Sequence, residues 1–127
     1  MIVVDCSAVV AILEREADRQ AYAEAIEAAE PPLMSSASFV ELAVVMLNRR
    51  GNIASGLVDR FLDVAQIEIA PLTREQALLA RAAYQRYKKT AGLNFGDCFS
   101  YALAKEKNMP LLFKGNDFTK TDIVSCL

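Results

Sequence analysis

Short apolar runs that end at a polar residue, Pro or Gly recur along the chain and predict buried strands. The strands we expect are residues 2–4, 33–34, 67–69 and 110–113, with 123–124 as a further strand at the sheet edge. Between them, apolar residues spaced three or four positions apart predict helices. The expected helices cover residues 7–13, 18–29, 38–50, 54–65, 74–89 and 97–107. Strands that alternate with helices favour a parallel sheet flanked by helices.

Capping signals place several helix ends. Ser7 is the expected N-cap of the first helix and Ser38 that of the third, which ends at Gly51. Thr73 and Gln76 match the capping box ahead of the long helix, and a loop is expected at residues 90–96. The apolar residues whose spacing predicts the third helix are Val40, Ala43, Val44 and Leu47.

Length and composition predict one globular domain over residues 1–127. Hydrophobic residues make up 54% of the chain and charged residues 24%, which excludes a disordered chain. The N-terminal apolar run is too short to span a bilayer, has no basic flank and contains Asp5, so we expect a cytoplasmic protein. The three separated cysteines match neither a disulfide framework nor a CxxC zinc site, and we expect Cys6 and Cys98 to fill space in a reducing compartment.

The net charge of −2 gives the chain no general attraction to nucleic acid. Binding of a polyanion would therefore require a local basic patch or a bound metal. Basic residues gather before Asp97 and beside Asp117, where they form either a solvated surface or a phosphate-binding rim. These residues are Arg81, Arg86, Lys88, Lys89, Lys114 and Lys120.

Four acids, Asp5, Glu41, Asp97 and Asp117, each follow a predicted strand or lie near the start of a predicted helix. Each has a structural explanation when taken alone. Asp5 and Asp97 suit helix N-termini, Asp117 suits an Asx-turn, and Ser38-x-x-Glu41 matches a capping box. In a parallel α/β fold, however, all four lie at the same edge of the sheet. Like charges gathered in this way require a divalent cation, and an all-oxygen ligand set selects Mg²⁺ or Mn²⁺.

Other uses of convergent carboxylates fit less well. A two-carboxylate glycosidase would need one protonated acid, and the chain has no Trp for a sugar platform. A phosphoaspartyl phosphatase would need a second Asp two residues after Asp5, where Ser7 stands instead. The absence of His argues against His-driven RNA cleavage and against zinc hydrolases. The residues therefore predict a metal-dependent hydrolase.

The motifs around these acids resemble those of PIN-domain proteins. An apolar strand followed by D-x-S opens the chain at residues 2–8, and S-x-x-E follows at residues 38–41. NFGDCFSYALA at residues 94–104 and LLFKGNDF at residues 111–118 resemble the third-acid and fourth-acid motifs of that family. The order and spacing agree along essentially the whole chain, and the chain looks most like VapC-type toxins of bacterial type II toxin–antitoxin pairs.

The resemblance implies a three-layer α/β/α fold and a Mg²⁺- or Mn²⁺-dependent endoribonuclease. Asp5, Glu41 and Asp97 would be the core metal-site and catalytic acids, Asp117 the more variable fourth acid, and Ser7 a hydroxyl that orients the site. Asn116 and Asp122 lie close in sequence to Asp117. Water activated by the metal would leave 5′-phosphate and 3′-hydroxyl ends on the RNA.

The resemblance also implies partners. These are an RNA substrate, a second copy in a homodimer, and a cognate antitoxin that inserts a helix into a groove and points a cation at the acids. Apolar residues of the 54–65 helix and of the first helices are expected to serve a partner surface. Two other roles stay open: an RNA-processing PIN nuclease without an antitoxin, and a non-catalytic PIN binding module.

Overall fold

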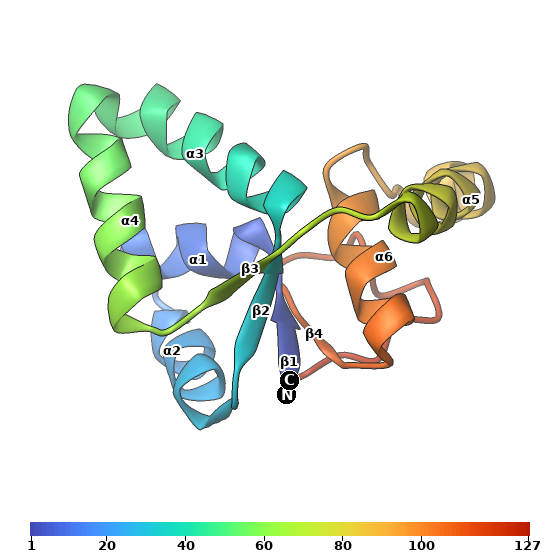
Figure 1. Cartoon of the computed structure of the whole chain (residues 1–127), viewed down its shortest axis with the longest axis horizontal. Coiled ribbons are helices and arrows are strands. Elements are labelled where there is room, and N and C mark those ends of the chain that lie inside the picture. The colour runs from blue at the N-terminus through green and yellow to red at the C-terminus, as the bar shows by residue number, and fades with distance from the viewer.

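The structure, a computed structural model, describes all residues from 1 to 127. A four-stranded sheet runs through its centre in the order β3-β2-β1-β4, and every neighbouring pair is parallel (Figure 1). In the register of the sheet, Val3 pairs with Leu33 on one side and with Leu111 on the other. The parallel sheet predicted from the sequence is confirmed. The strands are β1 (Ile2–Val4), β2 (Pro32–Ser35), β3 (Glu68–Ala70) and β4 (Leu111–Leu112).

Helices cover both faces of this sheet and make three layers (Figure 1). The helices are α1 (Cys6–Leu13), α2 (Arg19–Ala28), α3 (Ser36–Arg50), α4 (Ala54–Val64), α5 (Arg74–Ala91) and α6 (Asp97–Lys107). Side chains alternate across a strand, so Val4 packs with α1 to α4 in one hydrophobic cluster and Val3 with α5 and α6 in the other. No helix is both long and apolar enough to cross a bilayer.

Most helix and strand ends lie within one residue of the prediction, and three features differ by more. The N-cap of α3 is Ser35, whose hydroxyl accepts a hydrogen bond from the N–H of Ala37 at 3.2 Å. Ser38 therefore lies inside the first turn, and the capping box expected at Ser38 and Glu41 is wrong. Helix α5 extends through Ala91 because left-handed Gly92 ends it, so the following loop is two residues shorter than expected. Residues 123–124 form no strand, and only an isolated bridge joins Ser125 to Leu111.

The apolar residues that predict α3 are not in the core. Val40, Val44 and Leu47 are 57%, 50% and 48% exposed, whereas Leu42 and Met46 are fully buried. Apolar residues thus occupy two faces of this helix, and only one of them packs inside the protein. The outer face, Val40, Val44 and Leu47, is called the α3 stripe below.

Candidate active site

Asp5 lies at the carboxyl end of β1 and forms the N-cap of α1, where it is 3% exposed. Its Oδ2 accepts hydrogen bonds from the N–H and the hydroxyl of Ser7 at 3.0 and 2.7 Å. The cap of this helix is therefore Asp5, and the expectation that Ser7 caps it is wrong. The hydroxyl of Ser7 also accepts a hydrogen bond from the N–H of Lys114 at 3.0 Å, which ties the end of β1 to the loop after β4.

Asp97 begins α6 and shares a reciprocal pair of hydrogen bonds with Asn94. The N–H of Asp97 donates to Asn94 Oδ1 at 2.9 Å, and the N–H of Asn94 donates to Asp97 Oδ2 at 3.0 Å. This is the geometry of a capping box, formed here by Asn and Asp. It holds the carboxylate of Asp97 at the helix end and occupies only one of its two oxygens.

The environment of Asp97 disfavours its charged form. Burial is the main cause that raises the pKa of this carboxyl, to about 8, and the neighbouring carboxyl groups of Asp117 and Asp5 add to the rise. The hydrogen bond from the Asn94 N–H acts in the opposite direction. Asp97 therefore lies among other acids with no cation of the chain to neutralise it.

Glu41 reaches the same place from the second turn of α3. Burial raises the pKa of its carboxyl, Asp5 raises it further, and the thiol of Cys6 lowers it. The carboxylate lies against Gly96, where an added Cβ would overlap it. The backbone of Gly96 has ordinary right-handed angles (φ −64°), so glycine is required there for space.

Asp117 is half-buried in the turn after β4 and completes the group. Its Oδ2 lies 3.5 Å from the side-chain nitrogen of Asn94, and its carboxyl is near enough to Asp97 to raise the pKa of that residue. The two other polar residues of this region point to different roles. Asn116 is exposed, and Asp122 accepts hydrogen bonds from Tyr101 and Lys105 at 2.6 and 2.9 Å. Burial raises the pKa of Asp122, but the hydrogen bonds from Tyr101 and Lys105 lower it by more, to about 2.

Other polar groups near the site are already paired. The ammonium of Lys114 contacts Glu16 and Asp18 at 2.6 and 3.0 Å, which leaves it little freedom to serve a phosphate rim. Burial raises the pKa of the Cys98 thiol to about 11, and its Sγ donates to the carbonyl of Asn94. Burial and nearby acids also raise the pKa of the Cys6 thiol. Both thiols stay protonated at neutral pH and fill space.

The donor set fits a hydrated divalent cation. No group of three or more acid or thiol side chains is arranged to hold a metal by direct ligation alone. Mg²⁺ does not require such a cage, because it keeps several waters and binds through one or two carboxylates. The four acids offer oxygen ligands only. Burial, and then the neighbouring Asp117 and Asp5, disfavour the charged form of Asp97, and a bound cation would favour it.

Three polar residues next to the acids were given no site role of their own by the sequence. Asn94 pairs with Asp97, and Ser38 and Ser100 form a buried hydrogen-bonded pair that reaches Asp5. A signal for the serines exists in the sequence. Ser38 lies three residues before Glu41 and Ser100 three residues after Asp97, so each shares a helix face with a site acid.

Comparisons with known proteins agree with this fold. The PIN domain family model matches residues 2–124. Ribonuclease VapC28 of Mycobacterium tuberculosis is 43% identical, over 98% of this chain and 97% of its own length. Ribonuclease VapC30 of the same species is 46% identical, over 97% of this chain and 96% of its own.

Solved structures share this fold. The crystal structure of Mycobacterium tuberculosis VapC20, a Sarcin-Ricin loop cleaving toxin, matches with a TM-score of 0.76 and 19% identity, over 98% of this chain and 97% of that one. A toxin–antitoxin complex from Klebsiella pneumoniae contains a chain that matches with a TM-score of 0.72 and 18% identity, over 100% and 98%. The resemblance and the three-layer fold predicted from the sequence are confirmed. The chain belongs to the PIN-domain family, and its relatives over nearly the whole length are VapC ribonucleases.

Proposed function

We propose that this chain is a metal-dependent endoribonuclease that acts as the toxin of a toxin–antitoxin pair in the cytoplasm. The observation that carries the proposal is the meeting of Asp5, Glu41, Asp97 and Asp117 at one edge of the sheet in a chain without His. The VapC ribonucleases that align with 95% or more of the chain give the substrate class.

The residues that would hold Mg²⁺ or Mn²⁺ are the buried carboxylates of Asp5 and Asp97, with Glu41 and Asp117 beside them. When bound, such a cation lowers the pKa of water and offsets the charge that builds up at a phosphodiester. Asp5 is fixed by hydrogen bonds and orients the site. Burial raises the pKa of Glu41, which suits this residue to accept a proton from the attacking water. With water as nucleophile, the RNA products carry 5′-phosphate and 3′-hydroxyl ends.

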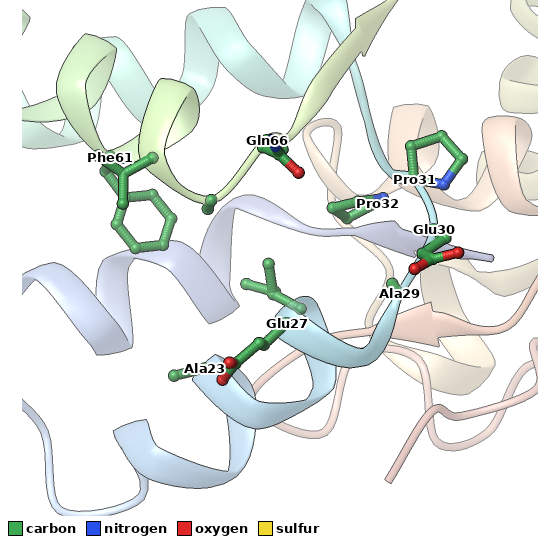
Figure 2. Close-up of a pocket in the computed structure, with 11 residues that line it drawn as sticks. Ala23, Glu27, Ala29, Glu30, Pro31, Pro32, Phe61 and Gln66 are labelled. Carbon is green, nitrogen blue, oxygen red and sulfur yellow. The ribbon is translucent and has the colours of Figure 1, made fainter.

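A groove on the surface supports the proposed antitoxin. It lies between α2 and α4, has a volume of about 710 Å³, and is lined by apolar side chains that include Ile26 and Phe61 (Figure 2). The exposed Glu27 and Glu30 are also among the residues that line it (Figure 2). An apolar groove with exposed acids in its lining suits an amphipathic helix that carries basic residues. This is the region of the 54–65 helix where the sequence predicts a partner surface.

The groove lies away from the acids. Pro32, at its edge, starts β2, whereas Asp5 follows the end of β1, so the two sites are separated by the length of a strand, roughly 10 Å. An antitoxin that fills the groove therefore needs a further segment to bring a cation to the acids. The α3 stripe is exposed elsewhere, next to Phe95 and Phe99, and we assign it to the homodimer.

The test is incubation with a structured RNA and Mg²⁺ or Mn²⁺, followed by mapping of the cut sites and product ends. Asp97→Asn is the inactive variant. Asp59→Asn, which removes the same charge from an exposed position of α4, is the matched control. We expect cleavage by the intact protein and by Asp59→Asn only. Equal cleavage by Asp97→Asn, or products with 2′,3′-cyclic phosphate ends, would overturn the proposal.

A further inference from the structure

Two buried serines from distant parts of the chain form a hydrogen bond next to the acids. Ser38 on α3 and Ser100 on α6 are both 0% exposed, and their hydroxyl oxygens lie 3.0 Å apart. The hydroxyl of Ser100 also lies 2.5 Å from Oδ1 of Asp5. This length is typical of a hydroxyl that donates to a carboxylate.

The direction of both hydrogen bonds follows from the chemistry of a hydroxyl group. Ser100 has one hydroxyl hydrogen, and a carboxylate can only accept. Ser100 therefore donates to Asp5, and Ser38 donates to Ser100. The three side chains form a relay in which each step satisfies a buried polar atom.

The hydrogen-bonded chain Ser38–Ser100–Asp5 joins the elements that carry three of the four acids. Ser38 lies one turn before Glu41 on α3, and Ser100 lies one turn after Asp97 on α6. Asp5 stands at the end of β1. The two hydrogen bonds therefore fix the separations of α3, α6 and β1. The distances between Asp5, Glu41 and Asp97 are fixed with them.

The relay also limits how Asp5 can act. Its Oδ2 accepts two hydrogen bonds from Ser7 and its Oδ1 accepts one from Ser100. A carboxylate has about four lone-pair sites, so one on Oδ1 stays available. Asp5 is thus held in one orientation with a single free acceptor position.

We propose that Ser38 and Ser100 are positioning residues of the active site, which hold Asp5 with one free lone pair for a divalent cation and set its distance from Glu41 and Asp97. The inference rests on the proposed function and adds two residues to it. The competing explanation is a buried polar pair that only satisfies its own hydrogen bonds in the core. The two explanations differ in what replacement of the serines does to metal binding.

The experiment compares Ser100→Ala, Ser38→Ala and the double variant with the intact protein. Ser55→Ala, at an exposed position of α4, is the control. Mn²⁺ affinity is measured by calorimetry without RNA, melting is measured without metal, and kcat and KM are measured on RNA. We expect the Mn²⁺ affinity of Ser100→Ala to fall about 10- to 100-fold. We also expect kcat to change more than KM. Ser38→Ala should lower the Mn²⁺ affinity and kcat as well, but by a smaller factor.

The double variant separates position from stability. It leaves no unpaired serine hydroxyl, so it should melt closer to the intact protein than Ser100→Ala does, yet bind Mn²⁺ as weakly. If all serine variants bind Mn²⁺ and turn over like the intact protein while only their melting changes, the positioning role is overturned and the nuclease stands. If the intact protein itself neither binds Mn²⁺ nor cleaves RNA, the proposed function fails, and this inference with it.

Discussion

The carboxylate of Glu41 occupies the place where a side chain at Gly96 would begin, since an added Cβ there would overlap it. The contact brings an acid of α3 to the start of α6, one residue from Asp97. Two helices that pack on opposite faces of the sheet thus deliver their acids to the same point. The local backbone would accept any residue at position 96. The preference for glycine therefore comes from the space that the Glu41 carboxylate occupies.

Gly96→Ala should therefore displace Glu41 and lower the cleavage rate. A misplacement of about 1 Å costs on the order of 100-fold in rate, and we expect a loss of that size in kcat. Gly56→Ala is the matched control, since an added Cβ there meets nothing within 4 Å. It lies within α4 and should raise the free energy of unfolding by roughly 0.5–1 kcal/mol with unchanged cleavage. Unchanged kcat in Gly96→Ala would show that the position of Glu41 does not matter.

Removal of divalent metal should abolish cleavage. EDTA is expected to stop the reaction on RNA, and excess Mg²⁺ or Mn²⁺ to restore it, because the acids offer oxygen ligands and the chain has no His to take over. The measurement is gel analysis of RNA fragments across a titration of metal into chelated protein. Full activity in chelator would exclude the metal mechanism.

Asp97→Asn should melt higher than the intact protein when metal is absent. The pKa of Asp97 is about 8 in the folded protein and has an ordinary value of 3.8. Between these values the folded state keeps a proton that the unfolded state has lost, so the free energy of unfolding falls as pH rises through this window. Asn does not ionise, so Asp97→Asn avoids this loss. Its free energy of unfolding at neutral pH should be higher by on the order of 1 kcal/mol.

Thermal melts from pH 4 to 8 at low salt check this expectation, with Asp59→Asn as the control for removal of a surface charge. The gain of Asp97→Asn should become small near pH 4, close to the ordinary pKa of 3.8, because below that value Asp97 is protonated in both the folded and the unfolded state. Saturating Mg²⁺ or Mn²⁺ should reverse the ranking, because the intact site binds metal better. A variant that is less stable under all conditions would mean that Asp97 serves chiefly as the helix-end partner of Asn94.

Expression of the intact protein without antitoxin should arrest growth, and Asp5→Asn or Asp97→Asn should relieve the arrest. Each change removes a negative charge and keeps the shape of the side chain. Growth curves give the result, and circular dichroism of the purified variants shows whether they remain folded. Full toxicity of both folded variants would refute the assignment of the site.

Val44→Asp should convert the proposed dimer into a monomer. It places a charge in the middle of the α3 stripe on both copies, where burial of an unpaired charge opposes association. Light scattering after size-exclusion chromatography measures the mass. Val64→Asp, on the groove side of α4, should leave the dimer intact and weaken co-purification with the antitoxin. A dimer that survives Val44→Asp would exclude the α3 stripe as the interface.

Local sequence signals predicted most of the elements that carry the acids. Asp5 follows an apolar run that forms β1, and the helix expected at residues 97–107 has those bounds as α6. The orientation of α3 was not predictable in the same way. Its apolar residues mark two faces, and only packing against the sheet decides that Leu42 and Met46 are buried while Val40 and Val44 are not.

The supporting residues of the site were missed for a related reason. Ser100 lies in a largely apolar helix, where a small side chain is expected only to fill space. Its role depends on Asp5, which lies 95 positions away in the sequence. Ser38 and Glu41 match a capping box by spacing, yet Ser35 takes the capping role and frees both side chains for the site. Local spacing places each serine on the same helix face as a site acid, but contacts between distant segments decide these roles.

The double use of Asp5 constrains how this toxin can be silenced by mutation. A change such as Asp5→Ala removes the N-cap of α1 and leaves the hydroxyl of Ser100 without its acceptor, so inactivation by loss of the side-chain oxygens also costs stability. Inactivation at Asp97 is expected to leave a protein that is at least as stable without metal. Spontaneous alleles that survive antitoxin loss should therefore divide into two kinds. Changes that remove both side-chain oxygens of Asp5 would lower the amount of folded protein, whereas Asp97→Asn would accumulate as a folded, inactive protein that still binds antitoxin.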